Sequence, residues 1–369
     1  DQDKFKELYE AAERKTSIKK KKIKAIDLFS AFATERKDTG RIYLMNVDHA
    51  NTHGAFIEDL APVKQSNLCC EINLPTNFDE MHKVCNLAVR GLDELLDYQA
   101  YPVLAAELST MNRRPLGIGI INFAYWLVKH ETNYQEPNLE LIDEWAEAWS
   151  YGLIKASNEL AQEKGACPLT MQTKYGQGIT PNQTYKKEVD ELVKHKERQN
   201  WKELRKNLVE HGIRNSTLMA LMPAETSAQI SNSTNGIEPP RGYISIKQSK
   251  HGVLKQVVPG FPYYKNKYDL LWDQKSPQGY LKIMAVLQKY IDQGISVNTS
   301  YNPEHYEDEK VPMSVLIQDL LMFYKYGGKQ LYYNNTYDGQ GEIDINKDDK
   351  LEDLPLGEID DEDCESCKI

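Results

Sequence analysis

The chain has 369 residues, of which 40% are hydrophobic and 27% are charged, and its formal net charge at pH 7 is −10. These values are typical of a globular protein with one large or two medium-sized cores. The negative charge argues against a nucleic-acid partner, and no apolar run is long enough to span a bilayer. Because the chain does not open on a signal segment either, we expect a cytoplasmic protein without a membrane partner.

The six cysteines are predicted to be thiols, because a long chain of this composition is not a small secreted disulfide scaffold. Two are adjacent, Cys69 and Cys70, and two form a C-x-x-C pattern, Cys364 and Cys367. A structural zinc site usually needs two such pairs, or one pair with two suitably spaced histidines. The sequence therefore predicts no metal site.

Residues 3–38 are predicted to form two helices, each with an apolar stripe. The lysines at positions 19–22 and 24 form a basic run, which we interpret as a solvated helix face, with anion binding as the alternative. A strand is predicted at residues 42–47.

Two histidines four residues apart, His49 and His53, follow that strand. On a helix this spacing could bind a metal, but the Asn, Thr and Gly residues around them indicate a loop. We therefore interpret both histidines as structural residues.

An extended run at residues 65–72 would place alternate side chains on one face. Asn67, Cys69 and Glu71 then form a row of an amide, a thiol and a carboxylate. A carboxylate beside a thiol raises the pKa of the thiol, and a thiol that stays protonated suits one-electron chemistry, in which sulfur gives up or takes a hydrogen atom. The alternative is a buried strand with an unreactive cysteine.

The middle of the chain has strong helical periodicity. Cys85 is expected in the core of one helix, and Cys167 is expected to be a packed loop thiol. Gly117 and Gly119 match part of a dinucleotide-binding fingerprint, but the third glycine is missing, so a nucleotide-cofactor loop is only weakly indicated. Helices are predicted at residues 79–99, 120–129, 137–164 and 201–211, and a strand at residues 215–222.

A further helix is predicted to start at Pro223, where Ala224, Glu225, Thr226 and Ser227 follow. A helix start presents N–H groups and the positive end of the helix dipole, and the two hydroxyls add donors, so this segment could bind an anion. A capped helix without a ligand is the alternative.

The last folded elements are predicted to be strands and helices, and the chain then turns acidic. Tyr332 and Tyr333 lie on the final short strand, where paired tyrosines usually serve packing. The predicted elements are strands at residues 243–246, 253–258 and 331–333 and helices at residues 277–293 and 311–326.

From residue 339 the chain is rich in Asp and Glu and is predicted to be a disordered tail. Cys364 and Cys367 lie at its end. A C-x-x-C pair on such a tail has no packing role, so we predict that it exchanges with another disulfide. Two unreactive thiols are the alternative.

Several of these segments together resemble the large catalytic subunit of a class I aerobic ribonucleotide reductase, over roughly its C-terminal half. The resemblance covers nearly the whole chain. In its half length, the chain resembles the C-terminal product of a phage large subunit that is split into two polypeptides. It rests on the combination of Asn67-Leu68-Cys69-Cys70-Glu71, Pro223-Ala224-Glu225-Thr226-Ser227, Leu331-Tyr332-Tyr333-Asn334-Asn335, Cys364-Glu365-Ser366-Cys367, Gly40-Arg41-Ile42-Tyr43, Asn51-Thr52-His53 and Asn235-Gly236-Ile237-Glu238-Pro239-Pro240-Arg241-Gly242.

The resemblance implies an α/β fold, namely the C-terminal half of a ten-stranded α/β barrel with a central thiol loop, followed by the disordered acidic tail. Strands that alternate with helices agree with such a half-barrel. The implied domains are a helical lead-in at residues 1–38, a catalytic half-barrel at residues 39–338 and a flexible redox tail at residues 339–369.

The family's catalytic roles are carried over residue by residue. Cys69 resembles the cysteine that becomes a thiyl radical and takes hydrogen from the ribose. Glu71 resembles the base on the neighbouring hydroxyl, and Asn67 the amide that holds substrate hydroxyls. Tyr332 and Tyr333 resemble the stacked pair that relays the radical from the small subunit.

The remaining roles concern the surroundings of the reaction. Arg41 and Tyr43 are expected beside the relay. The segment formed by Ala224, Glu225, Thr226 and Ser227 resembles the helix start that grips the substrate diphosphate. Cys364 and Cys367 resemble the tail pair that reduces the active site again after each turnover.

The resemblance also implies partners. This chain is expected to bind no cofactor itself. A diiron small subunit would supply the radical, thioredoxin or glutaredoxin the electrons, and a ribonucleoside diphosphate would be the substrate. The N-terminal half of the large subunit would be needed for activity.

The sequence departs from the family's pattern in three places. Ala224 stands where the family usually has Ser, so one hydroxyl is lost, and the tail cysteines are closer together than in several relatives. The family also reduces its substrate with a cysteine pair, one member of which lies on a strand soon after the thiol strand. Here Pro75-Thr76 runs almost directly into the next predicted helix, so that strand is missing: either this sequence omits a loop or the protein lacks the strand.

These departures leave a second function open, a dithiol electron-transfer or scaffold protein with a degenerate barrel. The thiol row together with the tyrosine pair favours the reductase. A thioredoxin-like oxidoreductase is disfavoured, because its C-x-x-C would open a helix and not end a tail.

Overall fold

A computed structural model describes residues 2–39, 44–57, 70–71, 78–249 and 252–338. Six of the residues singled out above lie outside this part: Arg41, Tyr43, Asn67, Cys69, Cys364 and Cys367. In the part of the chain that is described, no helix combines the length and the apolarity needed to cross a bilayer.

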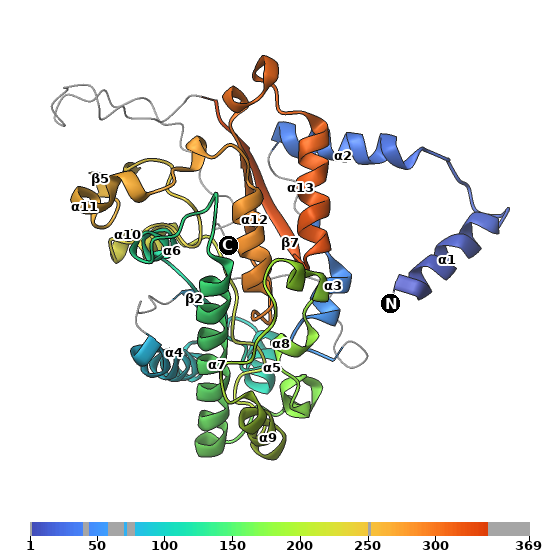
Figure 1. Ribbon diagram of the computed structural model, residues 1–369. Helices are drawn as coiled ribbons and strands as arrows, with labels where there is room; N and C mark the ends of the chain where they lie inside the picture. The colour runs from blue at the N-terminus through green and yellow to red at the C-terminus, as the bar shows by residue number, and fades with distance from the viewer. Residues whose placement is uncertain (1, 40–43, 58–69, 72–77, 250–251, 339–369) are drawn as a thin grey trace.

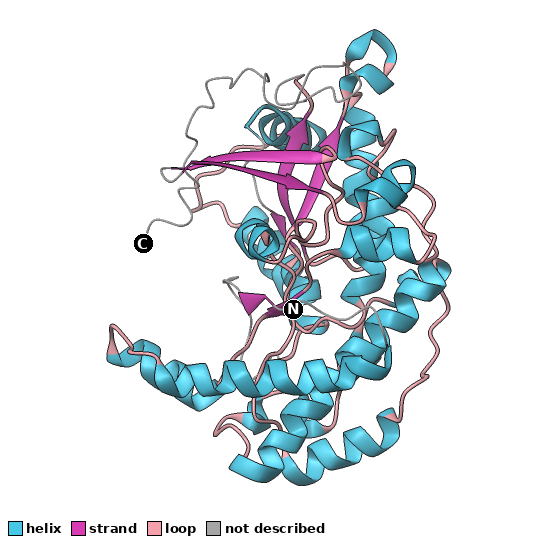
Figure 2. Ribbon diagram, turned by 90° about the vertical axis from the view of Figure 1, so that its left-hand side faces the viewer, coloured by secondary structure: helices cyan, strands magenta, loops and turns pink. Residues whose placement is uncertain are grey.

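A run of parallel strands forms the middle of the fold. β2 (Cys70–Glu71) pairs with β3 (Ile118–Gly119), and β6 (Val297–Tyr301) pairs with β7 (Gln330–Thr336), both in parallel. Single parallel bridges from Ile118 to Met219 and from Leu221 to Ile295 join these two pairs. β1 (Leu44–Met45) closes the β7 edge in the antiparallel direction, and Figure 2 shows the strands beside the surrounding helices.

The segment predicted as a strand at residues 215–222 is extended but makes only isolated bridges. One reason is Asp292, whose carboxylate accepts hydrogen bonds from the backbone N–H groups of Leu218 (2.8 Å) and Met219 (2.9 Å). Tyr175 donates a third, at 2.9 Å. A buried side chain thus takes the place of a neighbouring strand over part of this segment.

The two glycines considered for a cofactor loop lead into and form part of the short strand β3. A side chain at Gly119 would lie 2.6 Å from the sulfur of Met222 and 3.1 Å from the carbonyl of Ala220. Glycine is therefore needed for the close approach of the neighbouring segment. The packing of β3 thus accounts for Gly119 without a nucleotide-cofactor loop.

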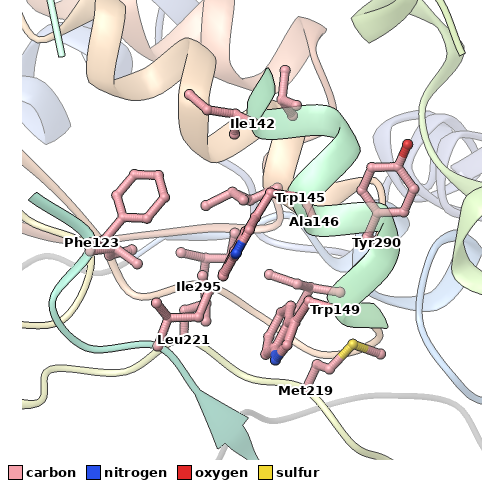
Figure 3. Packing of buried hydrophobic residues seen from close by; sticks show 14 of the residues in the cluster. Phe123, Ile142, Trp145, Ala146, Trp149, Met219, Leu221, Tyr290 and Ile295 are labelled. Atoms are coloured by element: carbon pink, nitrogen blue, oxygen red, sulfur yellow. The ribbon is translucent and has the colours of Figure 1, made fainter. Parts of the chain in front are cut away.

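α7 (Leu139–Lys164) runs vertically through the lower half of the molecule in Figure 1 and packs against α4 (Phe78–Tyr98), α9 (Trp201–His211) and α12 (Gln278–Gln288). Trp145 and Trp149 on α7 stack with their ring centroids 6.0 Å apart and are buried together with the apolar face of α12 (Figure 3). These helices were predicted from their periodicity, and their bounds agree to within a few residues except at the end of α12.

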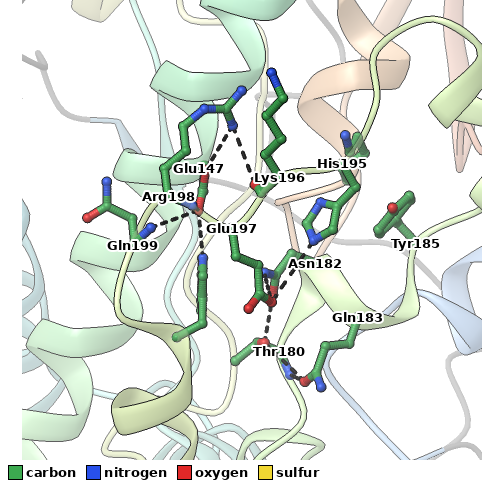
Figure 4. A network of polar contacts seen from close by, with 12 residues as sticks. Glu147, Thr180, Asn182, Gln183, Tyr185, His195, Lys196, Glu197, Arg198 and Gln199 are labelled. Atoms are coloured by element: carbon green, nitrogen blue, oxygen red, sulfur yellow. Dashed lines mark hydrogen bonds and ion pairs between the residues drawn. The ribbon is translucent and has the colours of Figure 1, made fainter.

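Two buried carboxylates of α7 bind the segment before α9 through hydrogen bonds and ion pairs. Glu147 accepts hydrogen bonds from the Trp201 indole (2.9 Å) and from the backbone and side chain of Arg198 (Figure 4). Asp143 pairs with Arg198 at 2.9 Å and with the fully buried Lys289 of the turn after α12 at 2.7 Å. Each buried carboxylate is paired, as burial of a charge requires.

The remaining elements lie around this centre. α2 (Ala25–Thr39) and α13 (Met313–Lys325) contact each other, and α2 also contacts β7. β4 (Ile244–Ser249) and β5 (Gly252–Val257) pair in the antiparallel direction, where two strands were predicted at residues 243–246 and 253–258. The other helices are α1 (Gln2–Arg14), α3 (Val47–Thr52), α5 (Leu104–Arg113), α6 (Phe123–Lys129), α8 (Pro181–Thr184), α10 (Glu225–Ile230) and α11 (Phe261–Tyr264).

Candidate functional site

The tyrosine pair lies at an irregularity in the sheet. Between the pairs Val297–Leu331 and Thr299–Asn334, β6 advances by two residues while β7 advances by three. The extra residue makes a bulge at Tyr332 and Tyr333, and a bulge re-aims side chains that would otherwise point to opposite faces. The two rings meet edge to face, with centroids 4.2 Å apart and planes at 65°.

Two side chains hold the bulge from other elements. Asn298 of β6 accepts a hydrogen bond from the backbone N–H of Tyr333 at 2.9 Å through its Oδ1. Arg36 of α2, which is buried, donates to the carbonyls of Tyr332 (2.8 Å) and Tyr333 (3.3 Å). The backbone groups displaced from the regular ladder are thereby satisfied.

The predicted anion-binding segment begins α10. Ala224 is the N-cap residue and is buried, and its side chain makes no capping hydrogen bond. Glu225 and Thr226 are exposed and Ser227 is half-buried. The backbone N–H of Ala224 donates a hydrogen bond to Oδ1 of Asn235, at 3.1 Å.

A hydrogen-bonded network joins this helix start to the tyrosine bulge. Asn235 donates to Oε2 of Glu238 at 3.4 Å, and Asn298 donates to Oε1 of the same carboxylate. Burial raises the pKa of Glu238, an effect opposed by the hydrogen bond from Asn298 and reinforced by the charge of Glu225. Two segments that lie over a hundred residues apart are thus parts of one site.

The predicted thiol row is only partly described. Asn67 and Cys69 lie outside the described residues, and of Glu71 the structure describes the backbone alone. Glu71 is on β2, where its partner is Gly119 of β3. Of the strand predicted at residues 65–72, the structure describes Cys70 and Glu71, and both are in a strand.

Cys85 and Cys167 are both buried, as predicted. Burial raises the pKa of Cys85 to about 12 and that of Cys167 to about 11. Both thiols are therefore protonated at neutral pH and unsuited to attack as thiolates.

The two histidines lie at α3 and not in the predicted loop. The His49 ring stacks on Tyr324 with centroids 4.6 Å apart, and its Nδ1 lies 3.0 Å from the Gly328 carbonyl. His53 contacts the Thr184 carbonyl, and burial lowers its pKa to about 4. The interpretation of both as structural residues is confirmed, while the loop prediction failed because a six-residue helix has almost no periodic signal.

Among the described residues no group of three or more His, Cys, Asp or Glu side chains is arranged to hold a metal ion. The site residues that sequence reasoning missed are Arg36, Asn298 and the roles of Asn235 and Glu238. The last two belong to the segment at 235–242 that was already part of the resemblance, so a signal was present for them. Arg36 and Asn298 had none, since their role depends on the register of β7.

The chain matches the family model of the ribonucleotide reductase barrel domain over residues 1–89 and 75–334. It is 50% identical to the ribonucleoside-diphosphate reductase subunit alpha of Haemophilus influenzae over 95% of this chain. It is 48% identical to the subunit alpha of ribonucleoside-diphosphate reductase 1 of Escherichia coli and 42% identical to the subunit alpha of phage T4, in both cases over 100% of this chain. The chain spans about half the length of these relatives, 50% to 51%.

The alignments also bear on the strand that the sequence analysis did not find after the thiol row. The alignment to the Escherichia coli relative has 399 positions for the 369 residues of this chain, so that relative has residues without a counterpart here. The match to the family model is divided at residues 75–89, which agrees with a missing segment at that point. By the extent of the family match and by its likeness to these subunits, the chain belongs to the ribonucleotide reductase family and carries its barrel domain.

Proposed function

We propose that the chain is the C-terminal part of the catalytic subunit of a ribonucleoside-diphosphate reductase, which converts ribonucleotides to deoxyribonucleotides by a thiyl-radical mechanism in the cytoplasm. The observation that carries the proposal is the contact of Tyr332 and Tyr333 at a bulge of the barrel domain. The parallel order of β2, β3, residues 216–222, β6 and β7 supports one half of a ten-stranded barrel.

Cys69 is proposed as the residue that takes a hydrogen atom from the ribose, with Glu71 as base and Asn67 as the amide that holds substrate hydroxyls. The pairing of β2 with β3 supports this, because it places the described end of the thiol row within the parallel sheet. A carboxylate two residues from the thiol keeps it protonated between turnovers.

Tyr332 and Tyr333 are proposed to relay the radical from a diiron small subunit, with Arg41 and Tyr43 beside them. Their ring contact supports a short hop between two phenols. Arg36 contacts the backbone carbonyls of both tyrosines and adds a positive charge near the pair.

Ala224, Glu225, Thr226 and Ser227 are proposed to bind the substrate diphosphate. The exposed start of α10 offers backbone N–H groups and the positive end of a short dipole, and Thr226 adds a hydroxyl. The alanine at 224 removes one hydroxyl, and its own backbone N–H is occupied by Asn235.

The acidic tail at residues 339–369 is proposed to carry electrons. Cys364 and Cys367 would reduce the active-site disulfide and would themselves be reduced by thioredoxin or glutaredoxin. No cofactor is proposed to be bound by this chain.

The partner that completes the enzyme is proposed to be the N-terminal half of the alpha subunit, whether joined to this chain or separate. The start of the chain supports this: from residue 5 to residue 32 no side chain is buried. Phe5, Leu8 and Tyr9 of α1 are 69%, 61% and 57% exposed. A 13-residue helix with such a face is marginal by itself and needs a surface to cover it.

A second function, the dithiol electron-transfer or scaffold protein, is favoured by the divided family match. The family's second reducing cysteine belongs to the segment that has no counterpart here. An assembled complex that binds the small subunit but never reduces a nucleotide would decide for this alternative.

The relay is tested by Tyr332→Phe and Tyr333→Phe, each of which removes a redox-active hydroxyl and keeps the ring. We expect turnover to be lost in the assembled enzyme while the affinity for the small subunit is unchanged. Tyr263→Phe is the control, because Tyr263 is 86% exposed on α11. Normal turnover in either relay variant would return the pair to a packing role.

A further inference from the structure

Adjacent residues of a regular strand point to opposite faces of the sheet, so two neighbouring tyrosines do not normally touch. The contact between Tyr332 and Tyr333 exists because β7 carries one residue more than β6 between the pairs on either side. Something must hold that extra residue, since a bulge interrupts the ladder and leaves backbone groups in need of partners.

We propose that Asn298 is the positioning residue of this pair: it fixes the bulge through the Tyr333 N–H and is itself oriented by Glu238. Asn298 is the β6 residue that faces the bulge, between Val297 and Thr299, whose partners on β7 are three residues apart. Its Oδ1 lies 2.9 Å from the nitrogen of Tyr333. This inference rests on the proposed relay role of the two tyrosines.

The orientation of the Asn298 amide follows from its two neighbours. The backbone N–H of Tyr333 can only donate, so it requires the oxygen of the amide. The carboxylate of Glu238 requires a donor, so it receives the amide nitrogen. Glu238 in turn belongs to the loop after α10, where Asn235 contacts both Glu238 and the backbone of Ala224.

Substitutions can remove the hydrogen bonds of Asn298 and then restore them. Asn298→Leu keeps the branched shape of the side chain and removes the acceptor. Asn298→Asp keeps the acceptor for the Tyr333 N–H but sets a carboxylate against Glu238. Combining Asn298→Asp with Glu238→Gln exchanges donor and acceptor, so that the pair is restored with its polarity reversed.

The matched control is Thr299→Val. Thr299 donates to Oδ1 of Asn334 at 2.8 Å, so this variant also removes a side-chain hydrogen bond between β6 and β7, one residue from Asn298. This hydrogen bond of Thr299 involves neither Tyr332 nor Tyr333. A general loosening of the two strands would therefore affect both variants alike.

The readout is the fluorine NMR shift of 3-fluorotyrosine at position 333 in this chain alone. The ring current of the other tyrosine is the difference between the unmodified sequence and Tyr332→Leu, which removes the aromatic ring. We expect that difference to vanish in Asn298→Leu and Asn298→Asp, to return in the double variant and to persist in Thr299→Val. A ring-current difference that survives Asn298→Leu, or that is lost equally in Thr299→Val, would overturn the inference.

Turnover of the assembled enzyme then separates this inference from the proposed function. Asn298→Leu is expected to lower the turnover number by about a hundredfold, as displacement of a reacting pair does, with an unchanged KM for the nucleotide. Loss of the ring contact without loss of turnover would leave the positioning role intact and contradict the relay.

Discussion

The first 32 residues expose their apolar side chains, whereas the region formed by α7 and α12 buries them. In α12 almost every residue is buried, and α7 buries two tryptophans and two carboxylates. Among the residues from position 5 onward whose burial the structure describes, Ala33 is the first buried one, although Phe5, Leu8, Ile23, Ile26 and Leu28 precede it. Figure 1 shows α1 standing away from the body of the molecule.

The difference indicates where the chain is self-sufficient. A packed core of tryptophan, leucine and isoleucine supplies its own stabilisation, whereas a short helix exposed on all sides does not. The body is therefore expected to fold by itself, and the start of the chain is expected to be stabilised by the rest of the alpha subunit. The next three predictions test this contrast, beginning with the largest effect.

Asp143→Ala should lower the free energy of unfolding by about 3–5 kcal/mol, because it leaves the buried Lys289 without its nearest carboxylate. Urea unfolding of the isolated chain measures this. Lys325→Ala is the control, since it breaks an exposed pair with Glu191 and a contact with the Tyr326 ring and should not change the midpoint. Equal midpoints for Asp143→Ala and the unmodified sequence would show that the centre does not depend on its buried ion pairs.

His53 should make the body sensitive to acid. Its folded pKa of about 4 lies below the ordinary value of 6.5, so between these values the unfolded chain binds the extra proton. Stability is therefore full above pH 6.5 and falls as the pH is lowered towards 4.

His53→Gln removes this titration and should reduce the loss of stability between pH 7 and pH 5 by about 1 kcal/mol. Thermal unfolding of both proteins across this range provides the measurement. If the stability of both proteins fell equally with pH, protonation of His53 would not destabilise the folded state.

The double variant Phe5→Ser, Leu8→Ser should change the stability of the isolated chain by less than about 0.5 kcal/mol, because exposed side chains contribute little to folding. The same variant should bind the N-terminal half of the alpha subunit at least tenfold more weakly, whereas Tyr263→Ser on the exposed part of α11 should bind normally. Calorimetric titration gives both affinities. Normal binding by the double variant would place the contact elsewhere.

The sequence predicted the elements whose signals are local. α9 is an example, because Asn200 caps its start, Gly212 ends it with a φ of +72° and its apolar residues recur with helical spacing. α5 was not predicted, and none of its residues is buried. β6 was missed because Asn298, Thr299 and Ser300 make it too polar for a predicted core strand.

The candidate site divides in the same way. The tyrosines and the start of α10 were found as short motifs, since each lies within a few consecutive residues. The bulge, Arg36 and the contact of Asn298 with Glu238 were not, because they join residues that are 35 to 297 positions apart. Such contacts leave no periodic signal in a single sequence.

The central claim is that this chain provides the reacting half of a ribonucleoside-diphosphate reductase, and reduction of a ribonucleoside diphosphate tests it most directly. The chain should show no turnover alone, should turn over when combined with the N-terminal half of the alpha subunit and a diiron small subunit, and should lose that turnover in Cys69→Ser, whose hydroxyl hydrogen is much harder to abstract. An assembled enzyme without turnover, or a Cys69→Ser variant that retains it, would contradict the account.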